Sequence, residues 1–364
     1  MAWNEILNHE SAFKRFQRSI ERNRLANTYL FVGPPGIGKR TFAIKLAQAL
    51  LCEANHDSPL MPCNQCQGCQ QVFAATHPDL ILVSRPAKKS IIPLEAFIGD
   101  KEHRRQEGLC HAIGLKPFRG GRKIAIIDDA DYLNQEGANS LLKTLEEPPP
   151  MSLLILIGTS EQRQLSTIVS RSQIVRFEPL SQSQVFEILN SKSIVENDAI
   201  SLTDLANASA GSLSAAVILS DPECFEFRRS LFQQLATRDP GQNEFAKTII
   251  DFAESAGKEN SLKRDRLILA ADFAITFYHQ WILTITQAEV DPDRVDPYLA
   301  TLTQEKSGDA PEDVNQTLDQ IARCIERCSD MQQQVRSNAG FANIVESWVR
   351  ELGWISRGPT PSAS

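Results

Sequence analysis

The chain has 364 residues, which is long for one ordinary domain, so two or three domains are expected. Hydrophobic residues make up 42% of it, enough to build real cores. Residues 1–180 hold 22 Lys and Arg and 18 Asp and Glu, which gives them a net charge of +4. Since the whole chain has a net charge of −7, residues 181–364 carry a net charge of −11. A protein that binds nucleic acid by itself usually has Lys and Arg residues clustered on one face. Any DNA contact is therefore expected to be weak or shared with partners.

The beginning of the chain and its apolar runs bear on location. Residues Met1 to Glu5 show no basic region followed by an apolar one, as a secretory signal would. No apolar run in the sequence approaches the length that a membrane span needs. We therefore expect a cytoplasmic protein without a membrane partner.

Five short apolar runs punctuate the first 180 residues and are rich in Ile, Val, Leu and Phe. They are Leu30 to Val32, Leu80 to Val83, Ile124 to Ile127, Leu153 to Ile157 and Ile174 to Phe177. Each is too short for a helix and has the composition of a buried parallel strand. Amphipathic helical stretches separate them. This alternation of strand and helix predicts a doubly wound α/β domain with a five-stranded parallel sheet.

Prolines and loops mark the limits of the predicted parts. The run Pro148 to Pro150 must stop the preceding helix, because proline clashes with the turn before it. No strand pattern follows a linker at residues 178–180. We predict an α/β domain at 1–179, a small helical domain at 180–221, longer helices at 222–356 broken by an acidic loop near 291–312, and a disordered tail at 357–364.

A glycine-rich loop lies between the first strand and an Ala- and Leu-rich helix. Its sequence is Gly33-Pro34-Pro35-Gly36-Ile37-Gly38-Lys39. In this setting glycines let the backbone turn its N–H groups toward a phosphate, and the helix N-terminus adds positive potential. The pattern predicts a P-loop whose Lys39 reaches the β- and γ-phosphates. The structural alternative is a Gly/Pro turn with a surface lysine.

The residue after Lys39 departs from the P-loop motif. Ser or Thr belongs there, since its hydroxyl binds Mg²⁺, but this chain has Arg40. Thr41 comes one residue later, about 100° further round the helix, so it cannot simply take that place. The loop is thus predicted to keep its shape with an altered chemistry, and ATP with Mg²⁺ is left open as a cofactor.

A pair of carboxylates ends the third predicted strand. Asp128 is the candidate on the metal side, in the pattern that holds Mg²⁺ in P-loop proteins. Asp129 stands where many such ATPases carry a glutamate that orients the attacking water, and it is shorter by one methylene. Alternatively, these two residues and Asp131 are solvated carboxylates near the start of a helix, where negative charge is favoured.

Four of the eight cysteines fall within eighteen residues, namely Cys52, Cys63, Cys66 and Cys69. In a cytoplasmic chain such clustering indicates metal binding and not disulfides. Thiolates with this spacing favour a structural Zn²⁺ ion, and a closed four-thiolate site leaves no position for catalysis. An iron–sulfur cluster and free thiols stay open as alternatives, as does replacement of one cysteine by His56 or His77. Cys324 and Cys328, four residues apart, are expected to be packed in a core.

These features together resemble bacterial clamp loaders of the AAA+ class, and most narrowly the delta-prime subunits of DNA polymerase III. The resemblance rests on the glycine-rich loop, the cysteine insertion, residues 126–131 and the run Ala138-Asn139-Ser140-Leu141-Leu142-Lys143-Thr144-Leu145-Glu146-Glu147-Pro148-Pro149. It covers residues 1–180 and is only architectural beyond them. In this family, residues 180–221 would be the lid domain and 222–356 the collar that assembles a ring.

The resemblance also implies roles for single residues. Ser170-Arg171-Ser172 matches the family's Ser-Arg-Cys motif, so Arg171 is the candidate arginine finger for a neighbouring subunit's ATP site. Without that motif, a surface salt bridge would be the preferred interpretation of Arg171. Thr159 matches the first sensor position. Ser214 stands where active subunits place an arginine on the lid, so the chain departs from the family's active members there.

The resemblance implies a largely hydrolysis-poor stator that supports ATP-dependent loading of a sliding clamp onto primed DNA. Its implied partners are gamma/tau-type ATPase and delta-type subunits in a hetero-oligomeric ring, with clamp and primer-template DNA contacted indirectly. Location at the replisome and membership of the DNA-directed DNA polymerase complex follow from the same resemblance. The alternative is an active AAA+ ATPase motor, which would have to function with Arg40 and Ser214.

Overall fold

The computed structural model describes residues 9–54, 60–86, 89, 91–104, 106–119, 121–195, 199–237, 241–307, 313–336 and 340–357. The chain divides into a first compact unit of residues 1–185 and 211–214 and a second unit of residues 186–210 and 215–364. The domain limits predicted from the sequence remain predictions. Of the predicted tail at 357–364, only Arg357 is among the described residues, and it ends the last helix.

The first unit contains a five-stranded parallel sheet. Its strands are β1 (Thr28–Val32), β2 (Leu80–Val83), β3 (Lys123–Ile127), β4 (Ser152–Ile157) and β5 (Gln173–Arg176). They lie in the order β2-β3-β4-β1-β5, and every neighbouring pair is parallel. The five strands predicted from apolar runs are therefore confirmed. Since β1 pairs with β4 on one side and β5 on the other, the loop that follows β1 leaves from the interior of the sheet.

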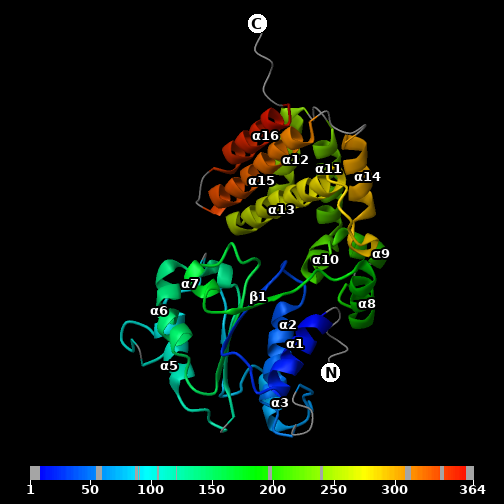
Figure 1. Ribbon diagram of the computed structural model, residues 1–364. Coiled ribbons are helices and arrows are strands. Elements are labelled where there is room, and N and C mark those ends of the chain that lie inside the picture. The colour runs from blue at the N-terminus through cyan, green and yellow to red at the C-terminus, as the bar shows by residue number, and fades with distance from the viewer. Residues whose placement is uncertain are drawn as a thin grey trace. The chain divides into compact units, whose positions relative to one another are not determined.

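Helices cover both faces of this sheet (Figure 1). On one face lie α1 (Glu10–Glu21), α2 (Lys39–Leu50) and α3 (Gln67–Phe73). The other face carries α4 (Glu95–Ile98), α5 (Leu109–Gly114), α6 (Gln135–Glu146) and α7 (Ser166–Val169). The short helix η2 (Ala130–Tyr132) follows β3. The predicted doubly wound arrangement is thus confirmed.

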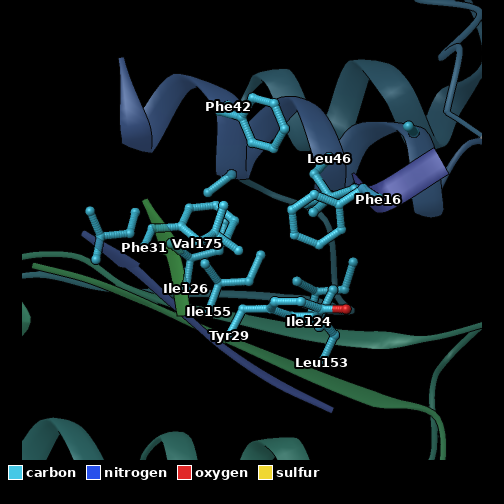
Figure 2. Close-up of a cluster of buried hydrophobic side chains, with 14 of the residues drawn as sticks. Phe16, Tyr29, Phe31, Phe42, Leu46, Ile124, Ile126, Leu153, Ile155 and Val175 are labelled. Atoms are coloured by element: carbon cyan, nitrogen blue, oxygen red, sulfur yellow. The ribbon is translucent and has the colours of Figure 1, made fainter. Parts of the chain in front are cut away.

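A cluster of aromatic and aliphatic side chains joins the first helical layer to the sheet. Figure 2 shows Phe16 of α1 and Phe42 of α2 above Phe31 and Tyr29 of β1. The ring centroid of Phe16 is 4.7 Å from that of Tyr29 and 5.8 Å from those of Phe31 and Phe42. All four rings are buried. Aromatic pairs at such distances add to the free energy gained by burial, so this cluster fixes α2, and with it the glycine-rich loop, on the sheet.

The end of α6 follows the proline rule. Asn134 caps its start, because the side-chain oxygen of Asn134 accepts the backbone N–H of Gly137 at 2.8 Å. The helix ends at Glu146, two residues before Pro148. The predicted stop is confirmed, and Leu141 and Leu145 lie on the buried face of α6.

The second unit is helical throughout its described residues. Its elements are α8 (Gln182–Lys192), which begins in the first unit, α9 (Leu202–Ala208), α10 (Leu213–Leu219), α11 (Pro222–Ala236), α12 (Gln242–Ser255), α13 (Asn260–Ile285), η3 (Pro292–Arg294), α14 (Pro297–Ser307), α15 (Val314–Arg336) and α16 (Phe341–Arg357). The buried residues Cys324 and Cys328 of α15 and Trp348 of α16 belong to its core, as expected for the cysteines.

The acidic loop predicted near 291–312 is wrong in part, because α14 occupies its middle. A buried ion pair organises the start of this helix: Arg228 Nη2 donates to Asp296 Oδ2 at 2.6 Å. The same carboxylate accepts the backbone N–H of Tyr298 at 3.0 Å and thus caps α14. A contact 68 residues apart in sequence cannot be read from local composition.

Helix α13 has the length and composition of a possible membrane span, with a mean hydropathy of 1.3 over its most apolar stretch. Its residues Leu267, Ala270, Ala274 and Phe277 are buried against the neighbouring helices of the second unit. The core helix of a bundle gives the same signal, so the lack of a membrane partner stays a prediction.

We expect the substitution Phe16→Ala to destabilise the full chain by about 3–5 kcal/mol, because it opens a cavity among three aromatic rings. Phe118→Ala is the matched control, since the Phe118 side chain is 79% exposed, and should change stability by less than about 0.5 kcal/mol. Urea unfolding of both variants measures the difference. Equal destabilisation would contradict the assignment of Phe16 to the core.

Candidate functional site

The glycine-rich loop is held tightly between β1 and α2. Gly33 N–H donates to Thr159 O at 3.1 Å, and a Cβ atom at Gly33 would lie 2.4 Å from Phe177 O. Gly36 and Gly38 have φ angles of +74° and +96°, which residues with a side chain rarely adopt. Glycine is therefore required here by geometry, and the loop turns into the N-terminus of α2, where backbone N–H groups face outward.

Lys39, the first residue of α2, lies across this loop. Its Nζ donates to Gly33 O at 2.6 Å and to Pro34 O at 2.5 Å. Burial lowers the pKa of Lys39 to about 8, although the charges of Asp131 and Asp128 oppose the shift. A lysine has three N–H donors, so one remains for a further acceptor beside the loop.

A cavity of about 410 Å³ adjoins the loop. Its lining brings together predicted site residues from distant parts of the sequence, namely Gly36, Gly38, Lys39, Thr41, Asp128, Asp129 and Thr159. Arg40, Asp131 and Ser214 line it as well. Strands β1, β3 and β4 all end at this edge of the sheet, which is where parallel α/β sheets bind ligands.

The carboxylates behind the cavity differ in their partners. Asp128 Oδ2 lies 3.6 Å from Arg40 Nε, and Asp128 Oδ1 accepts the backbone N–H of Asp129 at 3.0 Å. Asp129 has a φ angle of +58°, and burial, followed by the charge of Asp128, raises the pKa of its carboxyl. Asp131 accepts the backbone N–H of Thr159 at 3.0 Å and a bond from the Gln164 side chain. The alternative interpretation, in which all three carboxylates are simply solvated, is therefore wrong for Asp131.

Three contacts of the loop escaped prediction. His9 Nε2 lies 2.8 Å from Ile37 O, and its ring packs against Phe177 with centroids 4.8 Å apart. Leu213 N–H donates to Gly36 O at 3.0 Å, and this brings residues 211–214 over the loop. The Asp131 side chain fixes Thr159, as described above. Of these, only Asp131 had a sequence signal, since it shares the strand-end cluster with Asp128.

The four predicted cysteines meet in space. Their sulfur atoms all lie within 4.8 Å of one another, with Cys52 and Cys66 Sγ 3.9 Å apart and Cys63 and Cys69 Sγ 3.9 Å apart. A tetrahedron with Zn–S bonds of about 2.3 Å has S···S edges of about 3.8 Å, whereas a disulfide needs about 2.05 Å. The four sulfur atoms therefore fit a tetrahedral metal ion such as zinc.

The backbone around these sulfur atoms suits thiolates. Three backbone N–H groups donate to these sulfur atoms: Cys63 N–H to Cys52 Sγ at 3.4 Å, Cys66 N–H to Cys63 Sγ at 3.3 Å, and Cys69 N–H to Cys66 Sγ at 3.4 Å. Backbone N–H groups of Gln65 and Cys66 lower the pKa of the Cys63 thiol to about 6, and burial raises the pKa of Cys69.

The two histidines considered as ligands do not join the cluster. His77 Nδ1 accepts the backbone N–H of Asp79 at 3.0 Å, and His77 is absent from the group of converging ligand atoms among the described residues. His56 lies outside the described residues.

Comparison with known proteins fits this geometry. A family model described as "DNA polymerase III, delta subunit" matches residues 8–181. The Bacillus subtilis DNA polymerase III subunit delta' is 31% identical over 57% of this chain and 59% of its own length. The Escherichia coli subunit delta' is 30% identical over 63% of this chain and 64% of its own length. Over its first half, this chain is therefore similar to delta' subunits of DNA polymerase III. It spans about three fifths of the length of these relatives.

Gamma/tau subunits are similar to the same region of this chain. The Mycoplasma genitalium DNA polymerase III subunit gamma/tau is 31% identical over 60% of the chain and 35% of its own length. Identity alone therefore does not separate a delta-prime from a gamma/tau subunit here. The α/β fold class with a five-stranded parallel sheet is confirmed, and the individual site residues must decide the chemistry.

Arg171 lies apart from the cavity lining, directly after α7. Its Nη2 forms an ion pair with Glu146 Oε1 at 2.7 Å, and its Nη1 donates to Thr167 O at 3.2 Å. The side chain is 34% exposed and that of Glu146 52%. The isolated chain thus contains the salt bridge that was considered for Arg171, and this salt bridge lies on the accessible surface of the first unit.

We expect Gly36→Ala to destabilise the chain more than Gly38→Ala does. Both substitutions force a left-handed backbone on alanine, at about 1–2 kcal/mol. A Cβ atom at Gly36 would also lie 2.3 Å from Ser212 Oγ and 2.6 Å from Ser214 Oγ, whereas at Gly38 the nearest atom is 3.4 Å away. Thermal unfolding of the two variants compares them. An equal loss would mean that residues 211–214 do not rest on the loop.

Proposed function

We propose that this chain acts as the hydrolysis-poor stator of a DNA polymerase III clamp loader and supplies Arg171 to the ATP site of a neighbouring subunit. One observation carries the proposal: the phosphate loop keeps its shape while the Arg40 guanidinium faces Asp128 at 3.6 Å, in the place of the Mg²⁺-binding hydroxyl. A site that retains its architecture but loses its metal chemistry suits a subunit that shapes a ring and does not drive it.

Two further positions support poor hydrolysis. Asp129 is one methylene shorter than the glutamate that usually orients the attacking water, and displacement of such a group costs rate steeply. Burial also raises the pKa of its carboxyl. Ser214 lines the cavity where active subunits present an arginine, and a hydroxyl carries no charge to stabilise a γ-phosphate.

The trans role of Arg171 is compatible with its present partner. An exposed ion pair such as the one with Glu146 contributes only about 0–1 kcal/mol, so release to a more strongly charged partner costs little. A γ-phosphate in the transition state is such a partner, and a guanidinium binds it through two parallel N–H bonds. Until then Glu146 holds Arg171 extended from the end of α7.

The partners follow from this role. Gamma/tau-type ATPase subunits and a delta-type subunit would complete a hetero-oligomeric ring, with residues 180–221 as lid and 222–356 as collar. The acidic second half of the chain suits protein contacts better than DNA contacts, so the sliding clamp and primer-template DNA would be engaged through the ring. The protein would work in the cytoplasm at the replisome.

A second candidate function is an active motor subunit. The similarity to gamma/tau subunits favours it, as does the presence of Lys39, Asp128 and Thr159 in one cavity. Against it stand Arg40 and Ser214, which remove the Mg²⁺ ligand and the lid cation together. Brisk ATP hydrolysis by the purified chain, abolished by Lys39→Ala, would decide for the motor.

The cysteine insertion would hold one structural zinc ion. Cys52, Cys63, Cys66 and Cys69 would be its ligands, and the ion would close the loop between α2 and α3. Gly68 fits this packing, since a Cβ atom there would lie 2.5 Å from Leu51 O. Four protein ligands leave no open coordination position, so the ion would stabilise the fold without taking part in chemistry.

In an assembled ring, Arg171→Ala should slow ATP hydrolysis at one neighbouring site by roughly a hundredfold or more, as removal of an arginine finger does. Single-turnover measurements should then show that one bound ATP per ring is hydrolysed more slowly than the others. Arg163→Ala is the matched control, because Arg163 is exposed on the same segment and should leave the rates unchanged. Gel filtration of each ring excludes an assembly defect, and unchanged single-turnover kinetics with Arg171→Ala would refute the trans role.

Metal analysis of the purified chain should find about one zinc per chain, and none in Cys63→Ser. Cys110→Ser serves as control, because Cys110 lies outside the cluster and its Sγ donates to Ser140 O. Loss of zinc should also lower the melting temperature. If the purified chain instead contained iron and absorbed visible light, the zinc assignment would be wrong and the cysteines would hold an iron–sulfur cluster.

A further inference from the structure

Arg40 occupies the position from which a P-loop protein coordinates its metal. It is the second residue of α2, it lines the 410 Å³ cavity, and its Nε lies 3.6 Å from Asp128 Oδ2. The Asp128 side chain is 23% exposed and that of Arg40 56%, so the guanidinium reaches inward from the solvent side. The two residues form an ion pair across the edge where β3 ends and α2 begins.

The residues present do not fit a Mg²⁺ ion. Magnesium demands near-octahedral oxygen ligands at about 2.0–2.1 Å, and P-loop proteins supply a hydroxyl and a carboxylate. Here the hydroxyl position holds Arg40, a donor without lone pairs, and the carboxylate of Asp128 already faces that guanidinium. A divalent cation bound to Asp128 would also lie next to a positive charge, which repels it.

The same cavity does fit phosphate oxygens. Lys39 retains one N–H donor for a further acceptor beside the loop, and the backbone at Gly36 leaves no room for a side chain. The Thr159 hydroxyl is buried and has no hydrogen-bond partner among the described residues, although it lines the cavity. Buried hydroxyls are normally satisfied, so an acceptor at this point would complete the site.

We propose that Arg40 takes the place of Mg²⁺, so that the chain binds a nucleoside di- or triphosphate without a metal ion and keeps it unhydrolysed. This inference rests on the proposed stator function and deepens it by naming the ligand and its metal independence. The guanidinium of Arg40 neutralises phosphate charge through charge-assisted hydrogen bonds. It cannot coordinate the β- and γ-phosphate oxygens directly as Mg²⁺ does in P-loop proteins, and hydrolysis depends on that coordination.

A tightly held but intact nucleotide would act as a structural ligand. A ligand that binds only the folded state raises stability by mass action, in proportion to the logarithm of its concentration over Kd. It would tie the loop after β1 to α2 and to residues 211–214, whose Leu213 N–H already bonds Gly36 O. For a stator, rigidity of this region is the useful outcome of binding.

The test measures ATP binding to the full chain by calorimetry, in excess EDTA and in millimolar Mg²⁺. Wild type should bind with the same Kd within about twofold in both conditions. Arg40→Ser regenerates a Gly-x-x-x-x-Gly-Lys-Ser motif and frees Asp128, so its binding in EDTA should weaken by roughly ten- to a hundredfold and recover with Mg²⁺. Arg40→Lys keeps the charge and should keep the metal independence.

Arg176→Ser is the matched control, because Arg176 is 72% exposed, pairs with Glu161 and does not line the cavity. Thermal unfolding without nucleotide verifies that each variant folds. A wild-type Kd that tightens tenfold or more with Mg²⁺ would overturn the inference, as would undiminished binding by Arg40→Ser in EDTA. Failure of wild type to bind ATP in either buffer would also overturn it, while the stator proposal would still stand or fall with the ring ATPase of Arg171→Ala.

Discussion

The position of β1 between β4 and β5 is the constraint on which the candidate site depends. A chain that leaves the interior of a parallel sheet must turn at once toward a covering helix, between the loops of both neighbouring strands. Gly33 makes this turn, and its N–H donates to the carbonyl of Thr159, which follows β4. Phe177, which follows β5, donates its N–H to the carbonyl of Val32 at the end of β1. The loop, the end of β4 and the end of β5 are thereby fixed against one another. Lys39 and Thr159 come to line one cavity because of this hydrogen bonding.

Given this scaffold, the character of the site is decided by charges at its rim. Lys39 and Arg40 face Asp128, Asp129 and Asp131, so five ionisable groups share one cavity. Asp131 is occupied with Thr159 and Gln164 and serves the architecture. Burial raises the pKa of Asp129. Asp128 is the carboxylate that faces a cation, and Arg40 is the cation that the chain itself supplies. Under the proposal, a single residue after the lysine would separate phosphate recognition from metal chemistry, which in most P-loop proteins act together.

The sheet was predictable because buried parallel strands are short apolar runs, and all five were confirmed. The cavity residues were predictable because they follow those strands or form the loop motif. The contacts of His9 with Ile37 O, and of Leu213 with Gly36 O, were not, since each joins segments far apart in sequence without a motif. Helix α14 was missed for the same reason: its start depends on Asp296 pairing with Arg228. Local pattern predicts elements, and tertiary pairing decides which polar groups organise their ends.

The roles proposed for Arg171 and Arg40 give one type of side chain two opposite purposes. Among the described residues, each of these arginines pairs with one carboxylate, at 2.7 Å for Arg171 and Glu146 and at 3.6 Å for Arg40 and Asp128. Glu146 is half-exposed at a surface, so a stronger anion can draw Arg171 away at small cost. Asp128 is more buried and sits under the phosphate loop, where an anion in the cavity would bind Arg40 without removing it from its partner. In the proposed roles, the surroundings of each carboxylate, more than the arginine itself, therefore decide whether the cation acts on a neighbour or within the chain.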